Sequence, residues 1–94
     1  MIRSYGDRDT ERLAAGEKVR QFEPFRQQAE KRLRILDAAT SLGDLATLNS
    51  NHLEALQGNR KGQHSIRIND RWRICFNWPK DNSGPSNVVI IDYH

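Results

Sequence analysis

Two adjacent segments of this chain alternate apolar and polar residues, which is the pattern of half-buried β-strands. The first segment is Gln63–Ile68 and the second is Trp72–Trp78. The length of the loop between them decides which residues pair across the two strands. A three-residue loop, Asn69–Arg71, pairs Ile66 with Ile74 and keeps one continuous apolar face, whereas a two-residue loop would set a charged residue opposite an apolar one. We therefore predict an antiparallel hairpin with the three-residue loop.

This register makes Arg67 and Arg73 neighbours on the opposite face of the hairpin. Like charges directly opposite destabilise a strand pair by a few tenths to about 1 kcal/mol. A solvated face would tolerate the pair. A bound phosphate would reverse the sign, because guanidinium groups bind phosphate through charged, often bidentate hydrogen bonds. We favour phosphate binding, with Arg73 as the main ligand since it lies in the middle of the sheet.

Helical patterns precede this hairpin. Asp7 or Thr10 can cap a short helix that runs through Ala15 and is ended by Gly16. Pro24 suits the first position of a second helix, which we expect to run to about Ala39 with a single apolar stripe. Leucines after this helix are expected to form only a short turn against it.

Two further strands complete the predicted sheet. A first strand begins near Leu53, and the apolar run Val88–Ile91 is typical of a buried strand. The chain has 94 residues, enough for one hydrophobic core but not for a second lobe. We therefore expect residues 1–94 to form one domain with helices first and a sheet after them.

The net charge is +3, and the excess is local. From residue 60 to residue 73 there are five cations and one anion, Asp70. The five cations are Arg60, Lys61, Arg67, Arg71 and Arg73. Such an excess on a sheet favours an anionic partner such as RNA, DNA or an acidic protein, although a solvated face is the alternative.

The sequence also indicates a compartment. No apolar run is long enough to span a membrane, and Met1–Asp7 has no apolar segment of a secretory signal. A lone Cys75 cannot form an internal disulfide, which fits the reducing cytoplasm, and we interpret it as a packing residue. The three histidines and one cysteine lack the spacing of metal ligands, so we predict no metal and no cofactor.

Three polar sites are candidates for chemistry. Asp92, Tyr93 and His94 follow the predicted last strand, and an imidazole held there in a basic protein suggests proton transfer near an anionic substrate. A polar tail is the alternative. Glu54 is either a solvated carboxylate or a proton acceptor for a ribose hydroxyl. His64 shares the apolar face of its strand, so we expect it to be packed and hydrogen-bonded.

Several segments together resemble one protein family. The stretch Leu53–Ile68, followed by Arg71–Phe76, is similar to HigB toxins of the RelE superfamily, which belong to bacterial type II toxin–antitoxin systems. The opening Ile2–Ser4, the helix end Leu36–Thr40 and the closing Asp92–His94 also resemble HigB. The resemblance implies an α+β fold, with two N-terminal helices packed on a curved antiparallel sheet of three to four strands, as in RelE.

The resemblance also implies an activity and partners. HigB toxins are ribosome-dependent endonucleases that cleave mRNA in the A site of the 70S ribosome without a metal, and a cognate HigA-type helix-turn-helix antitoxin neutralises them. By position, His94 matches the proposed general acid, Asp92 and Tyr93 match its neighbours, and Arg73 matches the arginine that holds the scissile phosphate. Glu54 stands where some HigB proteins have histidine and the related YoeB toxins have a glutamate proposed as general base.

The remaining cations of the basic segment are predicted to bind RNA and the ribosome, namely Arg60, Lys61, Arg67 and Arg71. Gln57 stands where the family often has lysine, which removes one cation from this surface. Two other functions stay open. ParE-type toxins use a related fold to inhibit DNA gyrase without cutting RNA. A plain RNA-binding module is a weaker alternative, because the aromatic residues needed for base stacking face inward in the predicted register.

Overall fold

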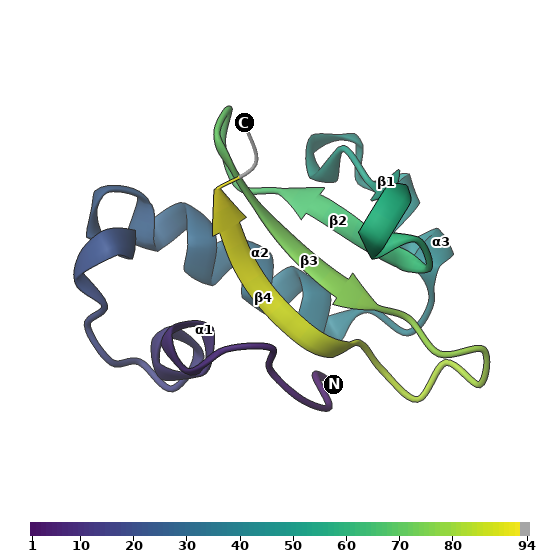
Figure 1. The fold of residues 1–94 in the computed structure, drawn as a ribbon, viewed down its shortest axis with the longest axis horizontal. Coiled ribbons are helices and arrows are strands. Elements are labelled where there is room, and N and C mark those ends of the chain that lie inside the picture. The colour runs from purple at the N-terminus through teal and green to yellow at the C-terminus, as the bar shows by residue number, and fades with distance from the viewer. Residues whose placement is uncertain (93–94) are drawn as a thin grey trace.

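The structure is a computed structural model that describes residues 1–92, and it has an α+β fold (Figure 1). Its elements are α1 (Arg8–Ala14), the 3-10 helix η1 (Arg20–Phe25), α2 (Arg26–Ala38), α3 (Leu42–Thr47), the short 3-10 helix η2 (Asn49–Asn51), β1 (Glu54–Ala55), the 3-10 turn η3 (Gly58–Arg60), β2 (Gln63–Arg67), β3 (Trp72–Asn77) and β4 (Ser86–Asp92). The four strands are antiparallel and lie in the order β1-β2-β3-β4. The predicted fold class is confirmed.

One face of the sheet forms the core with the helices. Ile66, Ile74 and Ile90 are neighbours on three strands, and each is at least nine-tenths buried. Leu13 from α1 and Leu36 from α2 belong to the same buried cluster. At roughly 25 cal/mol per Å² of buried apolar surface, this layer supplies the main stabilisation of the domain. The opposite face carries polar residues on β1, β2 and β3, beside Cys75, Val89 and Ile91.

The predicted hairpin register is confirmed. Ile66 pairs with Ile74, and Arg67 pairs with Arg73. The amide of Ile68 donates to the carbonyl of Trp72 at 2.9 Å, which closes the three-residue loop. The alternation of apolar residues sets this register, since a slip of one residue would turn the apolar face to solvent.

The first helix begins as predicted and the second does not. Asp7 caps α1, and its side chain accepts a hydrogen bond from the amide of Thr10 at 2.8 Å. Pro24 was predicted at the first position of the long helix, and this prediction is wrong. Pro24 lies inside η1, and α2 begins only at Arg26. In a 3-10 helix, residues three apart lie on the same side. Two phenylalanines at this spacing, Phe22 and Phe25, both pack against Trp72, with ring centroids 5.8 and 4.9 Å away.

The leucine-rich segment after α2 was predicted as a turn and instead forms a helix. α3 covers Leu42–Thr47, and Ser41 caps it by accepting a hydrogen bond from the amide of Asp44 at 3.2 Å. Leu45 is buried in the core. None of the helices within residues 1–92 is long and apolar enough to cross a membrane.

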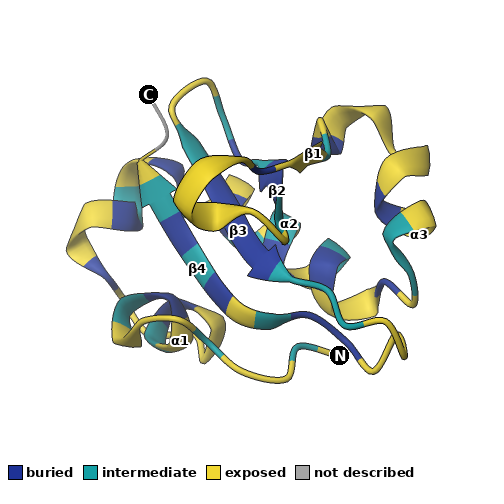
Figure 2. Cartoon of the chain, turned by 45° about the vertical axis from the view of Figure 1, so that its right-hand side comes forward, coloured by how far each residue is buried: buried dark blue, intermediate teal, exposed yellow. Residues whose placement is uncertain are grey.

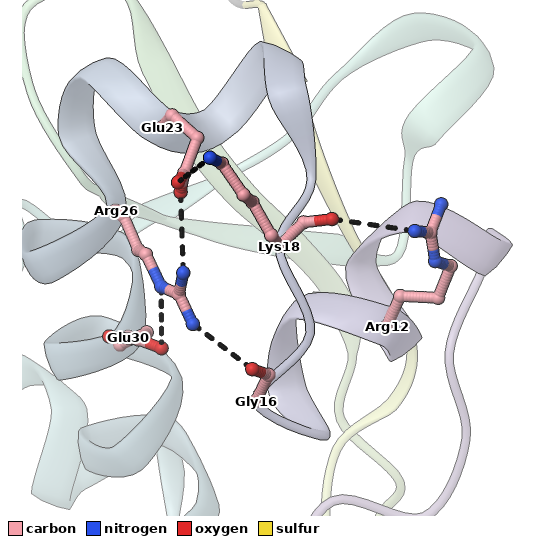
Figure 3. A network of polar contacts seen from close by, with 6 residues as sticks. All are labelled: Arg12, Gly16, Lys18, Glu23, Arg26 and Glu30. Atoms are coloured by element: carbon pink, nitrogen blue, oxygen red, sulfur yellow. Dashed lines mark hydrogen bonds and ion pairs between the residues drawn. The ribbon is translucent and has the colours of Figure 1, made fainter.

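A network of charged residues ties α1 and η1 to α2 (Figure 3). Arg26 is its centre. Its guanidinium group donates to the carbonyl of Gly16 at 3.0 Å, to Glu30 at 3.2 Å and to Glu23 at 3.5 Å. Lys18 also contacts Glu23 at 3.9 Å. The network therefore holds the segment between α1 and η1 against the long helix.

Replacing Arg26 with alanine is expected to lower the free energy of unfolding by about 1 kcal/mol. The substitution leaves the Gly16 carbonyl without its charged donor and removes two partly exposed ion pairs, whose combined contribution is modest. Urea unfolding followed by circular dichroism measures the change. Lys31→Ala is the matched control, because this exposed lysine of the same helix has no hydrogen bond or ion pair within residues 1–92. Equal midpoints for the two variants would contradict the assigned role of Arg26.

Candidate active site

The face of the sheet opposite the core carries a group of polar residues. Glu54 of β1 pairs with Ser65 of β2, which pairs with Cys75 of β3. Residues that pair across antiparallel strands point to the same face, and so do residues two apart along a strand. Arg67 and Arg73 therefore share this face with Glu54. The residues come from three strands, so the rigid sheet sets their spacing.

Arg73 is the most constrained of these side chains, because it is only 8% exposed. Its Nε donates to the hydroxyl oxygen of Ser65 at 2.8 Å, and its Nη2 donates to the backbone carbonyl of His52. Its Nη1 lies 3.9 Å from a carboxylate oxygen of Glu54. A buried charge is costly unless it is paired and hydrogen-bonded, and these three partners meet that requirement.

The two arginines that face each other across the hairpin have different partners. Arg67 forms an ion pair with Asp70 in the loop, whereas Arg73 turns towards Ser65 and His52. Each guanidinium group therefore has its own acceptors, which offsets the like-charge repulsion that the register creates. Arg73 is buried, and Figure 2 shows that the middle of β3 is buried as a whole.

These side chains line an open pocket of about 300 Å³. Its lining residues are His52, Glu54, Arg67, Asn69, Asp70 and Arg73. Carboxylates that accept protons and guanidinium groups that bind anions therefore meet in one hollow. Such a combination can hold a phosphodiester and take a proton from a neighbouring hydroxyl.

Asp92 lies elsewhere on the sheet. It pairs with Trp72, so it points to the core face at the end of β4 and does not line this pocket. Arg71 donates to its carboxylate from Nε at 2.8 Å and from Nη2 at 2.6 Å, and this ion pair raises the pKa of Arg71. Arg71 and Asp92, both predicted as site residues, thus contact each other. The predicted acid His94 and its neighbour Tyr93 lie outside the described residues.

The other predicted RNA-binding residues lie before β2. Arg60 ends η3, and Lys61 follows it, and both are exposed. Arg60 donates to the side chain of Gln63 at 3.3 Å. Burial raises the pKa of the Cys75 thiol, and the positive charges of Arg60 and Arg73 lower it by less. Cys75 is fully buried, which agrees with its interpretation as a packing residue.

Sequence reasoning missed two residues that contact Arg73. Ser65 could have been found from the register, since it lies on the same face and strand as Arg67. His52 gave no local signal, because its contact depends on a left-handed backbone conformation with φ 45°. The prediction for His64 is confirmed in part. Its ring stacks on that of Phe76, with ring centroids 6.3 Å apart, but its Nδ1 is buried with no hydrogen-bond partner within the described chain.

Comparisons with known proteins point to one family. A family model described as the RelE-like toxin of the type II toxin–antitoxin system HigB matches residues 3–94. The chain is 46% identical over 48 residues to Toxin HigB-1 of Vibrio cholerae serotype O1, and the match covers 51% of this chain. The chain spans about half of that curated relative, 50% of its length. Because the family model covers almost every residue, this chain belongs to the HigB family of RelE-like toxins of type II toxin–antitoxin systems.

Proposed function

We propose that this HigB-family toxin is a ribosome-dependent endonuclease that cleaves mRNA in the ribosomal A site. The observation that carries the proposal is the pocket in which Glu54 and the buried Arg73 face each other, with Nη1 and Oε1 3.9 Å apart. A guanidinium group held by the sheet is suited to bind a phosphodiester. A carboxylate beside it is suited to accept the proton of a ribose hydroxyl.

In the proposed reaction the ribose 2′-oxygen attacks the adjacent phosphorus. Glu54 takes the 2′-hydroxyl proton, and Arg73 stabilises the negative charge that develops on the phosphorane. His94 gives a proton to the departing 5′-oxygen, and Asp92 and Tyr93 act as its neighbours. The products are a 2′,3′-cyclic phosphate and a 5′-hydroxyl, and the proposed steps use no metal and no cofactor. Each positioned acid or base contributes about 10²- to 10⁴-fold to the rate.

The exposed cations support docking on the ribosome. Arg60 and Lys61 lie at the surface beside β2, where the phosphate backbone of RNA is an attractive partner. Arg67 and Arg71 already form ion pairs with Asp70 and Asp92, so we assign them smaller contributions to RNA binding. Lower salt should therefore strengthen ribosome binding.

The family implies a cognate antitoxin, and we propose a HigA-type helix-turn-helix protein encoded beside this chain. Residues 1–94 are proposed to act as one domain in the bacterial cytoplasm, where ribosomes and antitoxin are available. The expected result is growth arrest when the chain is expressed alone and normal growth when the neighbouring gene is expressed with it.

Mapping of RNA ends in arrested cells tests the activity itself. The proposal predicts mRNA cut within translated reading frames, with 5′-hydroxyl ends, and uncut copies of the same message when its start codon is removed. Intact mRNA together with DNA damage would contradict it and would favour a ParE-like gyrase inhibitor. Arrest with neither cleavage nor DNA damage would favour a non-catalytic RNA-binding module.

A further inference from the structure

We propose that Arg32 and Asn51 are positioning residues for Arg73, acting through the backbone carbonyl of His52. The inference rests on the proposed role of Arg73 as the phosphate ligand. It adds two residues, one of them on the long helix α2, that do not line the pocket.

Asn51 is a fully buried polar residue in η2. Its Nδ2 donates to the carbonyl of Leu45 at 3.1 Å, and its Oδ1 accepts from Nη1 of Arg32 at 2.8 Å. Both ends of the amide are therefore used. Leaving a buried polar group without its partner costs about 1–3 kcal/mol, so this side chain holds its segment firmly in one place.

Arg32 connects that segment to α2. The same Nη1 that donates to Asn51 also lies 3.2 Å from the hydroxyl oxygen of Ser50. Partial burial lowers the pKa of Arg32, as expected for a cation held against the protein. The contact to Asn51 joins residues 19 positions apart, so it ties η2 to a helix of 13 residues.

His52 follows Asn51 and has an uncommon backbone conformation, with φ 45° and ψ 53°. A non-glycine residue in this left-handed region costs on the order of 1–3 kcal/mol and persists only where its surroundings determine it. The buried Asn51 immediately before it provides such surroundings. In this conformation the carbonyl of His52 accepts a hydrogen bond from Nη2 of Arg73.

The planar guanidinium group of Arg73 is oriented by acceptors on two separate residues. The Ser65 hydroxyl oxygen accepts from Nε at 2.8 Å, and Nη2 donates to the His52 carbonyl and, at a longer 3.4 Å, to the Ser65 carbonyl. With both in place, Nη1 lies on the side of Glu54 and the pocket. If the His52 carbonyl moved, the guanidinium group of Arg73 could turn about its hydrogen bonds to Ser65. A misplacement of about 1 Å can cost on the order of 10²-fold in rate.

The test compares Arg32→Gln with Lys31→Gln. Both remove one positive charge from α2, but Lys31 is exposed and has no polar contact within residues 1–92. Cleavage of mRNA on purified 70S ribosomes gives kcat and KM for each full-length variant. We expect Arg32→Gln to lower kcat by about 10- to 100-fold with KM within about twofold, and Lys31→Gln to change neither by more than about twofold. Equal kinetics for the two variants would overturn the proposal.

A double-mutant cycle separates positioning from a general loss of stability. In an Arg73→Lys background the planar guanidinium group that His52 orients is already absent. Adding Arg32→Gln should therefore lower kcat by less than about twofold. Full additivity of the two losses would overturn the proposal. Arg32→Lys retains one donor for Asn51 and should recover most of the lost kcat. If it recovers nothing although it folds normally, the positioning role is also wrong.

A readout that does not depend on cleavage keeps this inference separate from the proposed function. In a ¹⁵N-labelled chain, exchange of the Arg73 Nη2 protons with water reports the hydrogen bond from Nη2 to the His52 carbonyl. We expect faster exchange in Arg32→Gln and unchanged exchange in Lys31→Gln. Unchanged exchange in both variants would overturn the positioning role even if the wild type cleaves mRNA. A wild type that cleaves no mRNA would instead remove the proposed function.

Discussion

A single 2′-deoxy nucleotide at the cut site is expected to abolish cleavage of ribosome-bound mRNA by this toxin. The proposed attacking atom is the 2′-oxygen, so its removal leaves the phosphodiester without a nucleophile. Neither Arg73 nor Glu54 can replace that atom, because the proposed mechanism has one bind the phosphate and the other accept a proton. Gel analysis of cleavage on ribosomes programmed with the modified message measures the effect.

The control places the deoxy nucleotide one codon away from the cut. That message contains the same modification, binds the same ribosome and should be cleaved at the rate of the unmodified RNA. Cleavage of the first message at a normal rate would show that water or another group attacks the phosphorus, and the proposed chemistry would then be wrong.

The substitution Glu54→Gln is expected to lower kcat by about 10²- to 10⁴-fold, the range typical of a lost general base. Glutamine keeps the size of the side chain but does not accept the proton. Glu54 is exposed, with 53% of its side chain accessible, so the substitution should cost little stability. It lies 3.9 Å from Nη1 of Arg73, and the amide also removes that ion pair.

Asp70→Asn separates the loss of a base from the loss of a charge. Asp70 also lines the pocket, but its side chain is 94% exposed and is paired with Arg67. Removing its charge should change kcat by less than about tenfold, since surface ion pairs contribute at most about 1 kcal/mol. Losses of equal size in the two variants would assign Glu54 an electrostatic role only.

The parts of the fold that follow from local patterns were predictable from the sequence. The alternation in Gln63–Ile68 and Trp72–Trp78 predicted the hairpin register, because only one register keeps its apolar face continuous. The sequence offered Asp7 or Thr10 as the cap of the first helix, and Asp7 is the cap. The break between η1 and α2 could not be predicted from the sequence, because it arises where Phe22 and Phe25 pack on the ring of Trp72 in β3.

Some residues of the candidate site could be predicted from the sequence, and some of their contacts could not. The register placed Arg73 beside Arg67, and the family resemblance indicated Glu54. The contact between Arg73 and the His52 carbonyl joins residues 21 apart in the chain and depends on a left-handed residue. Such contacts form only when α2, η2 and the sheet come together, so no local pattern indicates them. The ion pair of Arg71 with Asp92, also 21 residues apart, was missed for the same reason.

A structure of this toxin on a 70S ribosome that carries an mRNA with a 2′-deoxy cut site would show whether the scissile phosphate binds in the pocket. We expect the uncleaved phosphate to lie within about 3 Å of a guanidinium nitrogen of Arg73. The carboxylate of Glu54 should face the sugar carbon that lacks its hydroxyl. A message bound with its A-site phosphates on another face of the protein, away from both side chains, would contradict the roles proposed for Arg73 and Glu54.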